Sequence, residues 1–322
     1  MQKGLYTLCV LSIIAIVVLA IATIQNRIRV NTGEEVRQND KKNQQGSIPR
    51  PSRIVSANLG ADQILLEMVP ERIVAVSHLT LDPRLSHVTT AATQIPHRLK
   101  PDPEQILVLR PDLVVLGRMS PAALFSPIEG SGAKVFRFTE YQSISGIEKT
   151  VLELGGAVGA SDRASEIVSI MRKRLDEVGR KVASRPKPSV VYYNLGGFTG
   201  GKGTFIDNII ERAGGHNMTA AAGIYGSKKI SLESLIDMDP DVLVIMSSGR
   251  WDSSAENAFA SQPAIEKLRA SINGKVFVMS PRYLFAPSQH VVEAVEDLAR
   301  FLHPEAFGIV TGARNDLAPE KK

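Results

Sequence analysis

The chain has 322 residues, of which 43% are hydrophobic and 5% aromatic, enough for about two domains with sizeable cores. One cysteine excludes an internal disulfide framework and a cysteine-rich metal site. The net charge of +5 is spread along the chain without a long basic run, so no nucleic-acid partner is expected.

The amino-terminal segment has the composition of an export signal. After Lys3, residues 4–24 carry no charge, and as a helix they would extend about 32 Å, close to the thickness of a bilayer core. Ala20-Ile21-Ala22 offers the small-x-small pattern of a cleavage site, whereas the length favours retention. Residues 1–24 are therefore a signal peptide or an N-terminal membrane anchor. Both interpretations predict a periplasmic or extracytoplasmic protein, in the second case anchored to the inner membrane by residues 4–24.

The next segment, residues 25–52, is polar and contains no apolar period, so a linker is expected. Strands and helices then alternate. The apolar runs predict strands at 53–56, 73–76, 112–116 and 134–138, and helices at 61–68 and 104–109. Strands separated by helices indicate a parallel sheet covered on both faces.

One long amphipathic helix is expected from Ser161 to about Val182, ended by the Pro186 and Pro188 that follow. About 22 residues at 1.5 Å each would reach roughly 33 Å, enough to span two domains. The alternation then resumes. Strands are expected at 189–193, 241–246 and 276–279, and helices at 205–213, 230–238, 263–270 and 289–302.

The two halves of the chain repeat one another. Residues 103–116 and 232–245 each contain a glutamate, an apolar helix face, a Pro-Asp pair and an apolar strand, at a constant offset of 129 residues. A helix followed by Pro-Asp and a strand is a common connector, but two glutamates and two Pro-Asp pairs in one register favour a duplicated lobe.

In this order, the motifs resemble the substrate-binding proteins of ABC importers for ferric siderophores and cobalamin. The resemblance covers about residues 52–305. It is carried by Arg53–Ser56 with the helix after it, 104–116 with Pro111-Asp112, Gly203–Phe205 leading to Ala213–Asn217, and Leu302–Glu305.

The resemblance implies an α/β fold of two Rossmann-like lobes, with mostly parallel central sheets joined by one long rigid helix. The expected boundaries are 53–160 for the N-terminal lobe, 161–184 for the linking helix, 185–305 for the C-terminal lobe and 306–322 for a tail. Ligand would lie in the cleft between the lobes.

In that family an acidic residue on each lobe docks into arginine pockets of the membrane permease, and Glu104 and Glu233 match those positions. A carboxylate at a helix start can equally stabilise its own helix. The implied partners are an ABC permease with its ATPase and a small-molecule metal chelate, and the receptor is expected to be a monomer.

Ligand contacts are expected just after the strands, because open α/β lobes bind ligands beyond the carboxyl ends of their strands. Arginines beside aromatic rings suit a large, partly apolar ligand that carries oxygen anions, such as a ferric chelate. The candidates are Asn58, His78, Arg118, Phe198, Arg250, Trp251, Arg282 and Tyr283.

The motifs of nucleotide-binding proteins, hydrolases and metal sites are incomplete or absent in the sequence. The glycine-rich 196–203 resembles a phosphate-binding loop but has Gly203 where Ser or Thr must follow Lys202, so a flexible turn lining the cleft is expected. No nucleophile elbow of the Gly-x-Ser-x-Gly type occurs in the sequence, and no histidine pair has helix-face ligand spacing.

The sequence therefore predicts a non-enzymatic receptor for a ferric siderophore or corrinoid, with no catalytic residues, no cofactor and no resident metal site. The alternatives are an exported α/β enzyme acting on a small phosphorylated or glycosylated molecule, or a metal-ion receptor recruiting distant residues such as His78 and His216.

Overall fold

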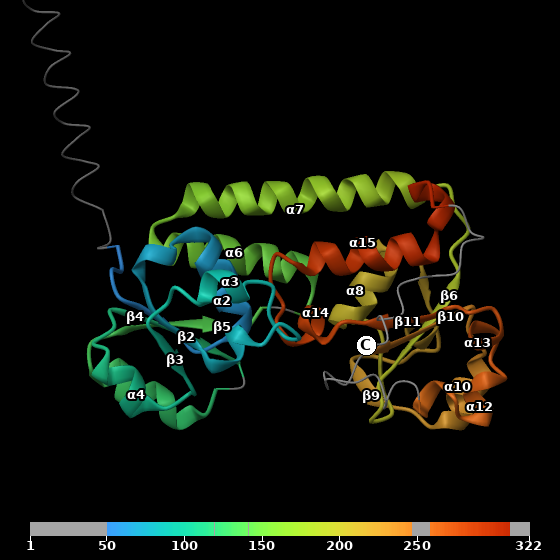
Figure 1. Ribbon diagram of the computed structural model, residues 1–322, viewed down its shortest axis with the longest axis horizontal. Coiled ribbons are helices and arrows are strands. Elements are labelled where there is room, and N and C mark those ends of the chain that lie inside the picture. The colour runs from blue at the N-terminus through green and yellow to red at the C-terminus, as the bar shows by residue number, and fades with distance from the viewer. Residues whose placement is uncertain (1–49, 119, 141, 247–257, 310–322) are drawn as a thin grey trace, which may run out of the picture. The chain divides into compact units, whose positions relative to one another are not determined.

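Two parallel sheets, each covered by helices, make up the described part of the chain (Figure 1). The structure is a computed structural model that describes residues 50–118, 120–140, 142–246 and 258–309. The expected signal or anchor, most of the linker, Arg250, Trp251 and most of the tail lie outside the described residues. Within the described ranges, no helix has both the length and the apolar composition needed to span a bilayer.

The N-terminal sheet has the strand order β3-β2-β1-β4-β5, and every pairing is parallel. Its strands are β1 (Ile54–Ser56), β2 (Ile73–Ser77), β3 (His97–Leu99), β4 (Leu113–Gly117) and β5 (Lys134–Phe138). Its main helices are α2 (Leu59–Met68), α3 (Thr89–Ala92), α4 (Pro103–Val108), α5 (Phe125–Gly130) and α6 (Ile144–Val158), with the 3-10 turns η1 (Pro70–Arg72), η2 (His78–Leu81) and η3 (Ala122–Leu124). All five residues of β4 are buried, as its continuous apolar run predicts.

The C-terminal sheet has the order β11-β10-β6-β8, again with parallel pairing. Its strands are β6 (Ser189–Tyr193), β8 (His216–Asn217), β10 (Val242–Met246) and β11 (Val276–Met279), beside an antiparallel pair of β7 (Phe198–Gly200) and β9 (Ser227–Lys229). Its helices are α8 (Phe205–Arg212), α9 (Met218–Ala221), α10 (Leu232–Met238), α12 (Pro263–Glu266), α13 (Arg269–Ile272), α14 (Pro281–Phe285) and α15 (Val291–Leu302), followed by the 3-10 turn η4 (Pro304–Phe307). The order β8-β6-β10-β11 repeats β2-β1-β4-β5.

The repeat extends to individual hydrogen bonds. Asp112 and Asp241, the acidic residues of the two Pro-Asp pairs, each accept from the backbone N–H and the hydroxyl of a serine, Ser52 and Ser189 respectively, at 2.6–2.9 Å. The residue before each Pro-Asp pair adopts a left-handed conformation, with φ 46° at Arg110 and 37° at Asp239. Equivalent carboxylates thus fix the strand that follows each helix onto its neighbour, so the repeat is structural as well as compositional.

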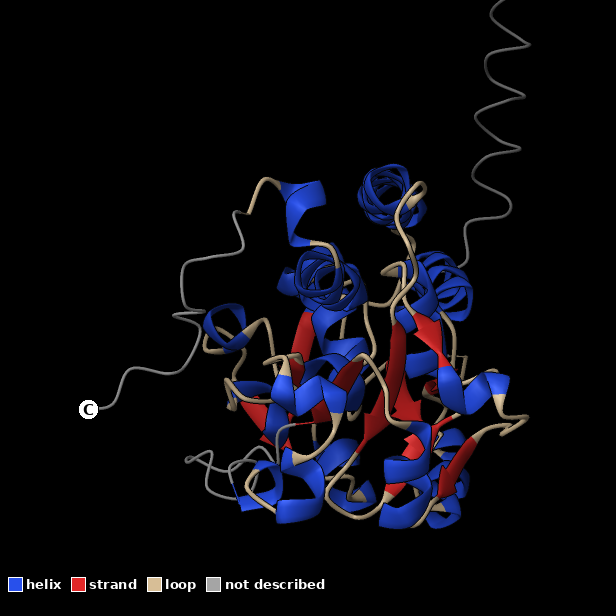
Figure 2. Cartoon of the chain, turned by 90° about the vertical axis from the view of Figure 1, so that its right-hand side faces the viewer, coloured by secondary structure: helices blue, strands red, loops and turns tan. Residues whose placement is uncertain are grey.

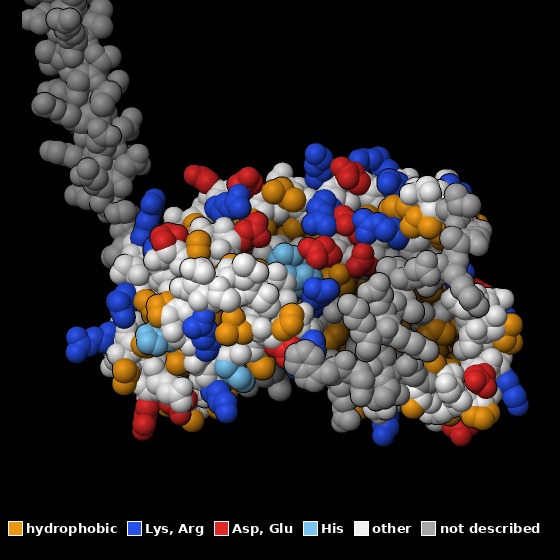
Figure 3. All heavy atoms as spheres, viewed as in Figure 1, with side chains coloured by type: hydrophobic (Ala, Val, Ile, Leu, Met, Phe, Trp, Pro, Cys, Tyr) orange, Lys and Arg blue, Asp and Glu red, His pale blue; other side chains and the backbone are white. Residues whose placement is uncertain are grey.

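Helix α7 (Ser161–Val182) has the bounds that the sequence predicts and joins the two lobes (Figure 1). It packs on α6 of the N-terminal lobe and on α15 and α8 of the C-terminal lobe. Gly155 of α6 permits the close approach, because a Cβ there would lie 2.3 Å from the Ala164 Cβ. Further along α7, Arg174 makes a bidentate ion pair with Glu296 of α15 at 2.8 and 2.9 Å. Figure 3 shows basic and acidic side chains along the exposed face of α7.

One apolar core runs through both lobes on the α7 side of the sheets, and each lobe has a further core on its opposite face. Figure 2, viewed along the long helices, shows helices on both sides of the strands. The described residues from Pro51 onward form one compact unit. The predicted fold class, two Rossmann-like lobes joined by one long helix, is confirmed.

Several segments differ from the sequence expectations, among them the following three. The helix expected at 263–270 is two short helices, α12 and α13, separated at Lys267 and Leu268. Helix α6 was not expected, because its Gly155 and Gly156 weaken the helical pattern. The glycine-rich 196–203 contains β7 and packs on its own lobe, since a Cβ on Gly200 would lie 1.9 Å from Ile206 Cγ2. None of these glycines lines the cavity described next.

Candidate functional site

A cavity of about 650 Å³ opens at the carboxyl ends of β1, β2 and β4 and is closed on one side by α14 of the C-terminal lobe. Its wall is mostly apolar, which suits the predicted large ligand. The lining residues from the N-terminal lobe are Ala57–Gly60, Ser77–Leu79, Arg84, Leu85, Pro101, Gly117, Arg118, Ser120 and Phe138, and those from the C-terminal lobe are Pro281, Leu284, Phe285 and Pro287.

Asn58 lines the cavity and is the N-cap of α2. Its Oδ1 accepts from the backbone N–H of Ala61 at 2.9 Å, so the side chain has a structural role beside any contact with ligand. A Cβ on Gly117 would lie 2.4 Å from Asn58 Nδ2, and a Cβ on Gly60 would lie 2.5 Å from the carbonyl oxygen of Pro287. These two glycines let the cap and the C-terminal lobe approach the ends of the strands.

A buried carboxyl group holds the segment that carries His78. Asp62 of α2 is fully buried and accepts from the Ser77 N–H at 3.0 Å and from the Thr80 hydroxyl. Burial raises the pKa of Asp62 from its usual 3.8 to about 7, although hydrogen bonds from Ser56, Thr80 and Ser77 favour the carboxylate. The protonation state of Asp62 thus affects the hydrogen bonds that hold Ser77 and the following turn in the wall of the cavity.

We expect the stability of the protein to fall between pH 4 and pH 7 because of Asp62. In this range the folded state holds a proton that the unfolded state has released, so the free energy of unfolding decreases as pH rises. Protonation of Asp62 contributes up to about 4 kcal/mol to the free energy of unfolding, because its pKa rises from 3.8 to about 7 on folding. The substitution Asp62→Asn should remove this slope, measured by urea unfolding at pH 4.5 and 7.5; an equal pH dependence in both proteins would contradict the assignment.

His78 and Arg118, two of the predicted ligand residues, line the cavity together. The His78 ring lies with Nδ1 3.3 Å from the carbonyl oxygen of Leu99, so Nδ1 donates in this contact. In the neutral ring Nε2 is then an acceptor. Arg118 is exposed, and its side chain makes no ion pair within the described residues. Arg84, also in the wall, is held by Asp82. Among the described lining residues, the cavity therefore presents the Arg118 guanidinium and the His78 imidazole over a mostly apolar surface.

The other predicted ligand residues lie elsewhere. On α14 the residues that line the cavity are Pro281, Leu284 and Phe285, which share one helical face, whereas Arg282 and Tyr283 do not line it. Tyr283 is 8% exposed and donates its hydroxyl to Asp297 at 2.8 Å. Phe198 is 43% exposed on β7 but is not among the lining residues. Arg250 and Trp251 lie outside the described residues.

Glu104 and Glu233 occupy equivalent exposed positions in the first turns of α4 and α10. In each helix the N-cap is the residue two positions before the glutamate. Asp102 accepts a hydrogen bond from the Gln105 N–H at 2.9 Å. Ser231 accepts one from the Ser234 N–H at 3.1 Å. Hydrogen bonds from its own backbone N–H and from Ser231 lower the pKa of Glu233. Both carboxylates are exposed at the starts of matching helices, one on each lobe.

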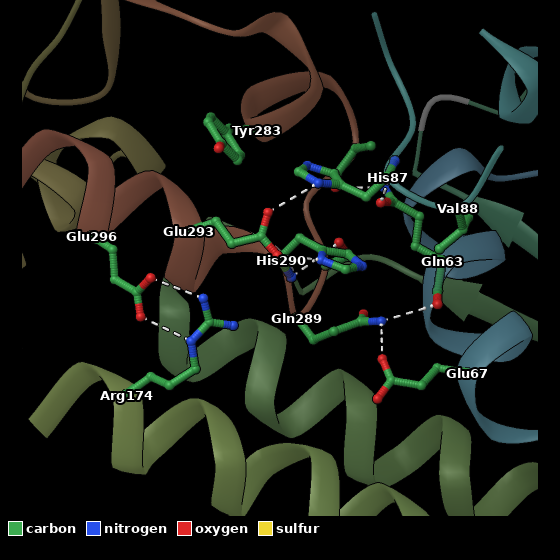
Figure 4. Close-up of polar contacts among 12 residues, drawn as sticks. Gln63, Glu67, His87, Val88, Arg174, Tyr283, Gln289, His290, Glu293 and Glu296 are labelled. Atoms are coloured by element: carbon green, nitrogen blue, oxygen red, sulfur yellow. Dashed lines mark hydrogen bonds and ion pairs between the residues drawn. The ribbon is translucent and has the colours of Figure 1, made fainter. Parts of the chain in front are cut away.

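A second polar region lies where the lobes meet, between α2 and the start of α15 (Figure 4). Gln63 donates to the carbonyl oxygen of Ala286 at 3.2 Å, and Gln289 donates to the carbonyl oxygen of Gln63 at 3.0 Å and to Glu67 at 2.8 Å. These contacts join the lobes, so the lobes are braced by more than α7.

Sequence reasoning missed a cluster at this junction, formed by His87, His290 and Glu293. Burial alone would raise the pKa of Glu293, but hydrogen bonds from His290 and His87 outweigh it and hold that pKa well below its usual value. The one local signal is His290 and Glu293 spaced by three at a helix start. His78 and His216, named for a metal-ion receptor, belong to no such cluster within the described residues.

These features define a two-lobed binding protein with a cavity between lobes joined by a helix. The profile of the periplasmic binding protein family matches residues 54–283, and the chain belongs to that family. Its members are binding proteins, as the sequence predicts.

Curated relatives and solved structures share this class. A cobalamin-binding protein of Halobacterium salinarum is 29% identical over 262 residues, covering 79% of this chain and 70% of the relative. An uncharacterized ABC transporter substrate-binding lipoprotein of Bacillus subtilis is 24% identical, covering 63% of this chain and 66% of its own. A periplasmic heme-binding protein of Roseiflexus sp. RS-1, in apo form, aligns with a TM-score of 0.68 at 22% identity, over 79% of this chain and 99% of that chain.

Proposed function

We propose that this protein is the extracytoplasmic receptor of an ABC importer, which captures a corrinoid or a ferric siderophore in the 650 Å³ cavity and delivers it to the permease. The observation that supports the proposal is a mostly apolar cavity that is lined by residues of both lobes, with the exposed Arg118 among them. A corrinoid is the first candidate, because the Halobacterium salinarum relative is a cobalamin-binding protein.

The chemistry of the wall supports this cargo class. Leu79, Leu284 and Phe285 offer apolar surface to a macrocycle or to the organic part of a chelate. The Arg118 guanidinium can donate to phosphate, carboxylate or hydroxamate oxygens, and His78 Nε2 can accept from a donor on the cargo. Nothing in this arrangement requires a chemical change of the ligand.

Titration of purified protein with cyanocobalamin, haem and a ferric hydroxamate tests the proposal. Trp251 is the only tryptophan, so its fluorescence reports binding without competing signals. We expect saturable 1:1 binding of one of these compounds, weakened about tenfold or more by Arg118→Gln, as for loss of a charge-assisted hydrogen bond. The exposed Arg180→Gln on α7 is the matched control and should bind like the unaltered protein.

Recovery of the bound compound distinguishes the receptor from the exported enzyme. Mass spectrometry after incubation should return the compound unchanged. A modified product, or no binding of any of the three compounds, would refute the receptor proposal.

We further propose that residues 1–24 direct export, either as a cleaved signal or as a retained anchor, with 25–52 as the linker before the N-terminal lobe. The mass of the protein isolated from its native host distinguishes these two forms. A full-length protein recovered from the cytoplasm would contradict export.

A further inference from the structure

Two histidines from different lobes share one carboxylate at the junction of α2 and α15. His87 lies in the loop after η2, whereas His290 and Glu293 lie at the start of α15 (Figure 4). His87 Nδ1 is 3.1 Å from one carboxylate oxygen of Glu293, and His290 Nδ1 is 2.8 Å from the other. The two rings stack at a centroid distance of 4.4 Å with an angle of 3° between their planes.

Glu293 is the sole hydrogen-bonding partner of either ring within the described residues. The His87 side chain is 6% exposed and that of His290 is 22% exposed. The Nε2 atoms of both rings are buried without a hydrogen-bond partner in the described part of the chain. An imidazole buried to this extent with one nitrogen unpartnered is costly, which indicates that these rings serve more than packing.

A cavity gives access to the cluster from outside. It has a volume of about 200 Å³, lies between α7 and α15, and is lined by His290 and Glu293 together with Glu67 and Arg174. Arg174 is ion-paired with Glu296, and Glu67 is ion-paired with Arg163. Within the described residues the carboxylate of Glu293 pairs with the two imidazoles and with no lysine or arginine, so Glu293 contributes the negative charge at this cavity. This charge favours a cation.

The donor set matches a transition metal. The candidate ligand atoms of the three residues all lie within 4.8 Å of one another. In a tetrahedral site with bonds of about 2.0–2.2 Å, neighbouring ligand atoms are roughly 3.3 Å apart, close to the present distances of 3.1 and 2.8 Å between each Nδ1 and the Glu293 carboxylate. The two rings would turn out of their parallel stack on metal binding, because each Nδ1 lone pair lies in the plane of its ring. Two imidazole nitrogens with one carboxylate suit Zn²⁺ or Ni²⁺ better than Mg²⁺ or Ca²⁺, which prefer oxygen ligands.

We propose that His87, His290 and Glu293 bind a divalent transition-metal ion, Zn²⁺ in the first instance, that joins the two lobes. One ligand comes from the N-terminal lobe and two come from α15. The site is separate from the cargo cavity, which none of the three residues lines. A metal there would hold the lobes at a fixed spacing without contacting cargo.

Calorimetric titration of tag-free, metal-free protein with zinc chloride at pH 7.5 tests the site. We expect one Zn²⁺ per chain, with affinity reduced at least about tenfold in His87→Gln and in Glu293→Gln. His97→Gln is the matched control, because His97 is exposed on β3, and it should bind zinc like the unaltered protein.

Thermal unfolding provides the second readout and shows that each variant is folded. Zn²⁺ should raise the melting temperature of the unaltered protein and of His97→Gln, and should not change it in His87→Gln or His290→Gln. Absence of saturable binding would overturn the proposal, as would binding that persists in all the cluster variants or is equally lost in His97→Gln. Cyanocobalamin and haem are absent throughout, so the outcome is independent of the proposed cargo.

Discussion

The double substitution Glu104→Ala/Glu233→Ala is expected to abolish cargo uptake while leaving the dissociation constant for cargo within about twofold of its original value. The reason is positional: both carboxylates are exposed at the starts of matching helices, and neither lines the cargo cavity. Truncating one partner of a hydrogen-bonded charge pair at an interface weakens association by about tenfold or more for each pair.

The measurement is ATPase stimulation and uptake by the permease reconstituted in vesicles, alongside cargo binding by the isolated receptor. Glu153→Ala/Glu266→Ala is the matched control, because it also removes one exposed carboxylate from each lobe. Normal uptake by the Glu104/Glu233 variant, or a loss of cargo affinity that accounts for its defect, would contradict the docking role.

Lys173→Pro in α7 should lower the free energy of unfolding strongly. Lys173 is exposed in the middle of α7, so the substitution changes the backbone without removing a buried side chain. Proline removes one helical hydrogen bond and clashes with the preceding turn, which costs about 3 kcal/mol or more in a helix interior. We expect the affinity for cargo to fall as well, because a kink in α7 would change the spacing of the lobes that supply the cavity walls.

Lys173→Ala is the control, and it should stay within about 0.5 kcal/mol of the unaltered protein in urea unfolding. If Lys173→Pro matched the stability and cargo affinity of Lys173→Ala, α7 would not act as a rigid connection between the lobes.

The repeated lobe could be predicted because its signals are local and strong. The strands at 134–138, 189–193 and 276–279 and the helix at 161–182 have the predicted bounds, since each is an apolar run or an amphipathic period with clear stops. The two Pro-Asp motifs, which the sequence places 129 residues apart, lie at equivalent positions in two sheets with matching strand orders. Their aspartates also make matching hydrogen bonds.

The site was less predictable, because the sequence indicates the edge of a sheet and not the direction of a side chain. The segment after β11 supplies Leu284 and Phe285 to the cavity, whereas Tyr283 on the same helix is buried against Asp297. The cluster of His87 and His290 could not be found from spacing, since the two histidines are 203 positions apart in the sequence and the approach of the lobes brings them together.

A crystal structure of the protein with bound cargo would show whether both lobes hold one ligand. We predict one molecule of cargo in contact with Arg118 of the N-terminal lobe and with Phe285 of the C-terminal lobe, with α7 unbroken between the lobes. Cargo bound to the surface of a single lobe, touching neither residue, would contradict this prediction.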